Sequence, residues 1–441
     1  MFENIIGQGA VLQLRDDILS SRYAPSMLFF GPSETGKGSA ALELSRVMSC
    51  EEKSEWKCPC ASCERHRYLM HDDLLILGNR SFSAEIAASC SAFLRNLSVT
   101  SAKILFFRSL RKLQIRFSPV LAEDDPKMAK VSSNLQSLDE KLNEFWALNP
   151  ETCEKKHLEN LCIALVKESL ALEKEGLSAN IPISHIRSAS WWCRLAPSGK
   201  QKTMIIENAE TMREEARNSL LKLLEEPPPA VSIVLTAQRR EAIMPTILSR
   251  LRPYRFLKRD NASEKEVIRL VFRDTVNEEK LETKGSILSI YLESFIPQST
   301  EKMYPLAAWF IVSLARIIAV SVKKARSKIP GIVNALGERY APIAETLKLE
   351  RAVKSETVIK TILAQSGNFE DDSFSRFMKI CLEMICVVTR SAENPEYIAY
   401  NDIFKKYIGE AVTAVDVLNI KEASALEALL FNLKKAVVRG K

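Results

Sequence analysis

The 441-residue chain has the composition of an ordinary folded protein, with 46% hydrophobic and 27% charged residues. This excludes a largely disordered chain, and the length is sufficient for two or three domains. The net charge of +7 arises from 62 basic and 55 acidic residues, so it only weakly indicates an acidic partner such as nucleic acid. The first residues, MFENIIGQ, lack the basic and apolar regions of a signal peptide, and we therefore expect a cytoplasmic protein.

Short apolar strands alternate with helices in two parts of the chain, which is typical of a parallel sheet in an α/β domain. In the first part we expect a helix over 11–20, a strand over 27–30, a helix over 39–48 and a strand over 74–77. In the second part we expect a strand over 202–207, a helix over 213–226 and a strand over 231–237.

The block between these parts, from about 81 to 180, is rich in Lys and Glu and has no turn glycine before Gly176. We interpret it as an inserted helical hairpin, because its removal leaves a continuous α/β pattern. Within it, Lys103–Phe117 is basic and amphipathic. This pattern favours a helix that buries Leu and Phe beneath solvated Arg and Lys, and the alternative is a nucleic-acid or partner surface.

After about residue 258 the strand signals end, and we expect a small helical domain to 296 and a larger one over 297–441. Tyr304–Val322 is nearly long enough to span a bilayer. Arg316 lies within it, and a charge near the middle of a membrane costs several kcal/mol. The segment is therefore expected to be a buried helix of the larger helical domain.

The stretch MLFFGPSETGKGS has the layout of a phosphate-binding P-loop, because an apolar strand, a turn from Gly31 and a helix from Gly36-Lys37 follow one another. Loop amides and the helix N-terminus hold phosphates in such a loop, and the lysine neutralises their charge. Gly31, Gly36 and Lys37 can still do this. Gly38, however, replaces the Ser or Thr whose hydroxyl coordinates Mg²⁺.

The acidic part of a nucleotide site is expected where the strand KTMIIE ends, at Glu207 and Asn208. In this class of enzyme the first residue orders Mg²⁺ and the second positions or deprotonates the attacking water. Asn208 cannot accept a proton, and losing a general base typically costs about 10²- to 10⁴-fold in rate. Gly38 and Asn208 together predict a chain without intrinsic ATPase activity, in which Lys37 holds a nucleotide or phosphate without turnover at most.

Five candidate metal ligands follow the P-loop helix in the stretch SCEEKSEWKCPCASCERH. A structural zinc site needs four ligands on a tetrahedron. The spacing favours Cys50, Cys60, Cys63 and His66, with Cys58 spare, and the all-cysteine set is the rival. Nothing nearby indicates catalysis at the metal, so the zinc would hold a small knuckle over about 50–66.

Several of these stretches resemble the bacterial DNA polymerase III clamp-loader subunits of the AAA+ superfamily, the gamma/tau and delta-prime group. The similar stretches are FENIIGQ, the cysteine knuckle after the P-loop helix, HDDLLIL, NSLLKLLEEPP and TILSRLRPYRF, which cover about 2–77 and 183–256. His66 departs from the pattern by standing in place of the last cysteine.

The resemblance implies an AAA+ nucleotide-type domain over 1–257, a lid domain over 258–296 and a helical collar domain over 297–441 that serves oligomerisation. Arg250, in LSR, would be an arginine finger that reaches the γ-phosphate bound to a neighbouring subunit. Gly38 and Asn208 point to delta-prime, the subunit that donates this finger while its own site is degraded. The implied partners are gamma/tau-like and delta-like subunits and, through the complex, the sliding clamp and primer-template DNA.

Two other functions remain open from the sequence. The first is an active gamma/tau-like ATPase in which Glu207 and a water rescue the metal site. The second is an AAA+-derived scaffold outside replication, with the inserted helices binding another partner.

Overall fold

The computed structural model describes most of the chain, and the following account is restricted to that part. The described residues are 1–122, 126–178, 180–275, 286–295, 300–324, 326, 329–349, 352–366, 373–391, 395–416 and 420–439.

A five-stranded sheet in the order β2-β3-β4-β1-β5 organises the N-terminal part, and every neighbouring pair of strands is parallel. The strands are β1 (Ser26–Phe30), β2 (Leu74–Gly78), β3 (Lys202–Glu207), β4 (Val231–Ala237) and β5 (Arg252–Arg255). Parallel neighbours require crossover connections, and the helices between the strands supply them. The first part of the chain thus contributes β1 and β2, and the second part contributes β3, β4 and β5.

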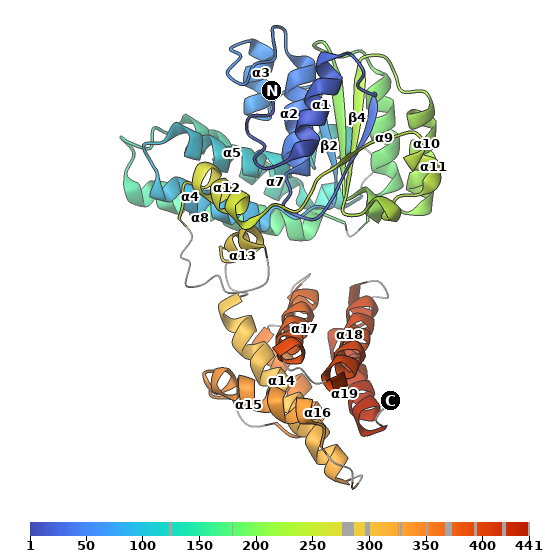
Figure 1. The fold of residues 1–441 in the computed structure, drawn as a ribbon. Coiled ribbons are helices and arrows are strands. Elements are labelled where there is room, and N and C mark those ends of the chain that lie inside the picture. The colour runs from blue at the N-terminus through green and yellow to red at the C-terminus, as the bar shows by residue number, and fades with distance from the viewer. Residues whose placement is uncertain are drawn as a thin grey trace. The chain divides into compact units, whose positions relative to one another are not determined.

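Helices cover both faces of the sheet (Figure 1). On one face lie α1 (Gly9–Leu19) and α2 (Lys37–Ser49), and on the other α9 (Ile183–Arg194), α10 (Glu214–Glu225) and α11 (Pro245–Leu248). Alternate residues of each strand enter the two cores, as the pleat requires: Met27 and Phe29 face α2, whereas Leu28 faces α9 and α10. The predicted fold class, a P-loop-type α/β domain followed by an all-α region, is confirmed.

Among its described residues the inserted block holds five helices, where the sequence predicted a helical hairpin. They are α4 (Ser83–Arg95), α5 (Thr100–Ile115), α6 (Pro119–Ala122), α7 (Pro126–Ala147) and α8 (Lys155–Gly176). Phe93, Phe106 and Phe145 form the centre of a separate core, with ring centroids 5.1–6.3 Å apart. Aromatic side chains from three helices, α4, α5 and α7, meet in this core.

Short elements complete the N-terminal part. The helix α3 (Ala61–Arg67) carries the cysteine-rich stretch and packs on α2, and two single 3₁₀ turns lie at η1 (Ala209–Thr211) and η2 (Arg240–Ala242). The helices α12 (Asn261–Val271) and α13 (Ile287–Glu293) share a small core with Ala88 and Ala92 of α4. The predicted lid segment therefore packs on the insertion.

Among the described residues, the C-terminal part is all helical and has one core. Its helices are α14 (Thr300–Lys324), α15 (Gly331–Glu345), α16 (Ser355–Ser366), α17 (Ser373–Ser391), α18 (Pro395–Asp416) and α19 (Glu422–Arg439). Met303–Lys324 is the one described helix long and apolar enough to cross a membrane, yet 72% of its most apolar stretch is buried. It is the central helix of this core, as the sequence predicted.

The chain forms two compact units, Met1–Ile296 and Pro297–Lys441. Residues 296–299, where the predicted boundary between lid and collar falls, lie outside the described residues. The predicted division of the first unit at 257 stays a prediction.

Candidate functional site

The P-loop joins β1 to α2 as the sequence predicted. Gly31 has φ +150°, and a Cβ there would lie 2.0 Å from the Phe256 carbonyl oxygen, so only glycine fits. Gly36 caps α2 in the left-handed conformation, with φ +90°. Lys37 begins the helix, and its Nζ donates to the Gly31 and Pro32 carbonyls at 2.6 and 2.5 Å. Burial lowers the pKa of the Lys37 ammonium to about 8.

Gly38 faces the predicted acidic residue across a very short gap. A Cβ on Gly38 would lie 2.6 Å from Glu207 Oε1 and 3.3 Å from Arg80 Nη1. A serine or threonine therefore cannot enter this position unless Glu207 moves. The missing hydroxyl at position 38 and the position of the Glu207 carboxylate are therefore linked, because the carboxylate lies where a side chain at position 38 would have to fit.

Glu207 ends β3 and is 5% exposed. Its Oε1 lies 3.4 Å from Arg80 Nη1, and its Oε2 forms a close ion pair with Arg116 Nη2. Burial acts to raise the pKa of Glu207, but Arg116 and Arg80 outweigh it and hold the pKa below its usual value. The carboxylate is therefore ionised, with each oxygen turned to a guanidinium group.

Asn208 follows Glu207 in the left-handed conformation, with φ 53°. Its Nδ2 donates to Asn79 Oδ1 at 3.2 Å, and its backbone N–H donates to Thr236 Oγ1 at 3.3 Å. The side-chain amide of Asn208 thus connects the end of β3 to the residue after β2, and its backbone N–H connects β3 to β4. The side-chain amide cannot take up a proton from water.

The cations that surround Glu207 come mostly from the insertion. Arg116 is the C-cap of α5, and Lys112, one turn earlier, pairs closely with Glu85 of α4. Arg80 lies 2.8 Å from Glu85, so direct ion pairs join three cations to two carboxylates. Burial opposes ionisation of Glu85, but Lys112 and Arg80 hold its pKa at about 2. Sequence reasoning missed Arg80 and Arg116, and the basic pattern of Lys103–Phe117 was the signal that could have drawn attention to the second.

Two other basic residues of α5 also donate to backbone carbonyls within the chain. Arg108 donates to the carbonyls of His66 and Arg67 at the end of α3. Arg111 donates to the Leu69 carbonyl at 3.2 Å. The basic face of this helix therefore holds the cysteine-rich segment and the acidic residue in place, and these two arginines are not a free surface.

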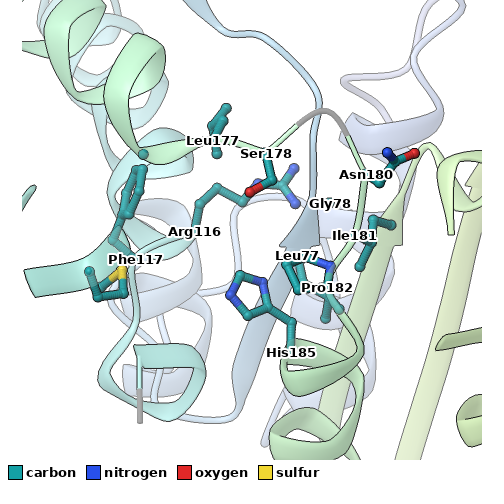
Figure 2. A pocket seen from close by; sticks show the side chains of 12 residues that line it. Leu77, Gly78, Arg116, Phe117, Leu177, Ser178, Asn180, Ile181, Pro182 and His185 are labelled. Carbon is teal, nitrogen blue, oxygen red and sulfur yellow. The ribbon is translucent and has the colours of Figure 1, made fainter. Parts of the chain in front are cut away.

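A cavity of about 20 Å³ lies beside Arg116, between the ends of β2 and α8 and the start of α9. Figure 2 shows the Arg116 side chain pointing toward Ser178 and Gly78 at its edge. A smaller cavity of about 10 Å³ is lined by Gly38, Arg80 and Glu207. A cavity needs about 10–15 Å³ to hold one water, so each of these spaces is about the size of one or two waters.

Arg259 is a further cation at the P-loop that sequence reasoning did not identify. Its Nε donates to the Ile6 carbonyl at 2.9 Å, and its Nη1 donates to the Glu34 carbonyl. Its Nη2 would lie 2.8 Å from a Cβ on Gly36. The segment that follows β5 thus places a guanidinium directly against the loop.

Arg250 follows α11 at the surface, with its side chain 33% exposed. Nη2 lies 2.6 Å from Glu225 Oε1 of α10, and Nη1 donates to the Thr246 carbonyl at 2.7 Å. An exposed ion pair of this kind typically contributes about 0–1 kcal/mol, so the guanidinium can exchange Glu225 for another anion at little cost.

Four cysteines converge beside the end of α2. Cys50, Cys58, Cys60 and Cys63 are buried, and their sulfurs all lie within 4.8 Å of one another, as a metal site requires. Backbone N–H groups of Ser54 and Glu52 donate to Cys50 Sγ at 3.2 and 3.4 Å. Burial opposes ionisation, yet these bonds lower the pKa of the Cys50 thiol to about 7. The donor set fits a structural Zn²⁺.

His66, a favoured ligand in the sequence analysis, is not part of this group. Its ring stacks on His71 with the centroids 4.1 Å apart, and neither ring nitrogen has a partner among the described residues. Burial lowers the pKa of His66 to about 2, so the ring is neutral. The structure thus favours the rival all-cysteine set. Cys60 is the N-cap of α3, and the turn that it makes lets Cys58 approach despite the single intervening residue.

One protein-family model matches this chain over two segments. The family model described as DNA polymerase III, delta subunit, matches residues 7–114 and 138–260, just over half of the chain. The gap between these segments, 115–137, falls inside the inserted block, so most of that block lies within the match.

Two individual proteins show weaker similarity. Protein STICHEL of Arabidopsis thaliana is 44% identical over 64 residues, which make up 14% of this chain and 5% of that protein. A DNA polymerase III gamma subunit-related protein of Thermotoga maritima is 19% identical, and the alignment covers 59% of this chain and 81% of that chain with a TM-score of 0.34.

Proposed function

Because the chain belongs to the family described as DNA polymerase III, delta subunit, we propose that it is a delta-prime-like subunit of a clamp loader. In this role it does not hydrolyse ATP. It donates Arg250 to the nucleotide of a neighbouring ATPase subunit while the sliding clamp is loaded on primed DNA. Its partners would be gamma/tau-like and delta-like subunits in the cytoplasm.

The observation that carries the proposal is that the Glu207 carboxylate pairs with two arginines, Arg80 and Arg116. A carboxylate that orders Mg²⁺ must have an oxygen free for the metal, and both oxygens of Glu207 face guanidinium groups. Gly38 supplies no hydroxyl, and Asn208 supplies no base. Two of these features act on Mg²⁺ binding and the third on the attacking water, so reverting any one of them would not restore the reaction.

Arg250 supports the second half of the proposal. An arginine finger must leave its own subunit's contacts when the neighbouring nucleotide arrives. Arg250 is at the surface, and its contacts, with the Glu225 carboxylate, the Thr246 carbonyl and the Ser249 hydroxyl, are all exposed. Arg116 and Arg259, by contrast, are buried and bound to their own chain.

The zinc proposal rests on the four converging cysteines. Bound Zn²⁺ would cross-link the loop between α2 and α3, and it would contribute folding free energy to a segment that has little apolar core of its own. The four sulfurs would fill the tetrahedral coordination, which leaves no position for a substrate.

The decisive experiment is ATP hydrolysis by a complex reconstituted with gamma-like and delta-like partners. Arg250→Ala is expected to reduce turnover by about 10³-fold or more at the affected site, the magnitude typical of an arginine finger. Lys37→Ala is expected to leave turnover unchanged. The matched control is Arg240→Ala, because Arg240 is also an exposed arginine and lies ten residues before Arg250.

The opposite pattern would contradict the proposal. If Lys37→Ala abolished turnover by the complex, or if the isolated chain hydrolysed ATP at a steady rate, the active gamma-like function would be the better description. If the chain failed to assemble with clamp-loader subunits, the scaffold function outside replication would replace it.

A further inference from the structure

A buried arginine connects the P-loop helix to the cysteine cluster. Arg46 lies in the last turn of α2 and is 3% exposed. Its Nε and Nη2 donate to the two carboxylate oxygens of Glu43 at 2.9 and 2.7 Å. This bidentate pair fixes the plane of the guanidinium, because a fork of two parallel bonds allows one orientation.

The other side of the same guanidinium faces the cluster. Nη1 lies 3.0 Å from Cys63 Sγ and donates also to the Glu55 carbonyl at 3.1 Å. Nη2 donates to the Ser54 carbonyl at 3.1 Å. Arg46 therefore contacts one sulfur and the loop that carries the cluster.

Charge gives this contact a specific role. Four thiolates around one Zn²⁺ carry a net charge of −2, and a buried charge is stable only when it is paired and hydrogen-bonded. Among the described residues, Arg46 is the cation with a hydrogen bond to a cluster sulfur. Lys200 is near, but its Nζ donates to the Cys50 carbonyl at 2.7 Å.

Glu43 extends the connection to the start of the chain. Its Oε1 accepts a hydrogen bond from the Phe2 backbone N–H at 3.2 Å. A continuous path of polar contacts thus runs from Phe2 through Glu43 and Arg46 to Cys63. Because Glu43 and Arg46 both lie on α2, this helix supports the cluster from within the α/β domain.

We propose that Arg46 is a positioning residue of the metal site, which orients Cys63 Sγ toward the metal and offsets the negative charge of the four-sulfur site. This inference rests on the metal centre proposed above. Outer partners of metal ligands typically change metal affinity by about 10- to 100-fold.

The test is competition for zinc between the purified full chain and a chromogenic chelator. Arg46→Gln is expected to weaken zinc binding by about 10- to 100-fold. Arg108→Gln is the matched control, since Arg108 also holds this segment but donates to the carbonyls of His66 and Arg67 and not to sulfur. It is expected to change the affinity by less than threefold.

A spectroscopic readout separates contact with sulfur from general loosening. In the Co²⁺-substituted chain, the sulfur-to-cobalt charge-transfer band is expected to shift in Arg46→Gln and to stay unchanged in Arg108→Gln. Since Arg46→Gln leaves Glu43 unpaired and can impair folding, the double variant Glu43→Gln/Arg46→Gln is measured as well. It is expected to fold and to show the same loss of affinity and the same shift.

Three results would overturn the inference. If Arg46→Gln and Arg108→Gln weakened zinc binding equally, the loss would come from loosening of the loop and not from the contact with sulfur. If the double variant bound zinc with wild-type affinity, Arg46 would have no role in the metal site. A wild-type chain that neither contains nor binds zinc or cobalt would contradict the metal centre itself. This last result is distinguishable from the others because it is seen before any variant is made.

Discussion

Replacement of Arg116 by methionine tests whether Glu207 is held as an ionised carboxylate by the insertion. The side chains of Arg116 and Glu207 are 1% and 7% exposed, so the pair belongs to the buried class. Removing one partner of a buried ion pair typically costs about 3–5 kcal/mol. Because Arg80 remains 3.4 Å from the carboxylate, we expect the lower end, about 3 kcal/mol, at neutral pH.

The stability deficit of Arg116→Met should also depend on pH, in a direction that follows from the pKa of Glu207. In the wild-type chain the pKa of Glu207 lies below its usual value of 4.5, so its contribution to stability is complete above pH 4.5 and is lost as the pH falls through the folded-state pKa. In Arg116→Met, burial is opposed only by Arg80 and Lys112, and the folded-state pKa rises. The deficit of the variant is therefore greatest at pH 7 and shrinks toward pH 4.

Urea unfolding in a Trp309→Phe background measures this effect. The other four tryptophans, at 56, 146, 191 and 192, all lie in the first unit, so fluorescence then reports that unit. Arg111→Met is the control, since Arg111 lies on the same helix but donates to Gln114 and the Leu69 carbonyl. It should show the same deficit at pH 7 and pH 4. A deficit for Arg116→Met below about 1 kcal/mol at pH 7, the value of an exposed pair, would refute the reasoning.

Two further predictions, which use three substitutions, test the remaining parts of the site. Gly38→Ser restores the hydroxyl type but should lower stability by about 1–3 kcal/mol, the usual range for overpacking, because its Cβ would lie 2.6 Å from Glu207 Oε1. Thermal unfolding checks this, and a stabilised Gly38→Ser chain that binds Mg²⁺-ATP would contradict the geometry. Cys58→Ser should remove bound zinc while His66→Gln retains it, because the four sulfurs converge and His66 stacks on His71. Zinc content by elemental analysis decides between the two ligand sets, and the reverse result would favour the set with histidine.

Four of the five strands and the P-loop could be predicted because their signals are local, whereas β5, a short strand of mixed polar and apolar residues, was not predicted. An apolar run followed by Gly31 and Gly36-Lys37 specifies a strand, a turn and a helix within a dozen residues. Both glycines are required by backbone conformation or close approach, which leaves a visible pattern in the sequence. Gly38 and Asn208 were readable for the same reason, as departures at positions that the pattern defines.

The surroundings of Glu207 could not be predicted because they depend on long-range contacts. Arg116 and Arg80 lie 91 and 127 residues away from it along the chain. A basic amphipathic helix indicates an apolar face and a charged one, but not which carboxylate the charged face meets. The sequence analysis favoured solvated Arg and Lys on α5, whereas Arg116 is buried against Glu207.

The cysteine ligands were an intermediate case. Spacing identified five candidates, but the choice among them depends on where α3 begins. Because Cys60 is the N-cap of α3, its sulfur and that of Cys63 lie on the same side of the first turn. His66 is three residues further along the helix, where it packs against His71 and not against the sulfurs.

The helix α5 links the two sites that the sequence treated as separate. Its Arg108 and Arg111 hold the end of α3, which carries Cys63, and its Arg116 and Lys112 hold Glu207 and Glu85. An ATPase site needs room for its metal and nucleotide to come and go, whereas here buried ion pairs fill that position. The filled site agrees with the proposed subunit that does not hydrolyse ATP, and the proposed role of Arg250 as an arginine finger depends instead on its contacts at the surface.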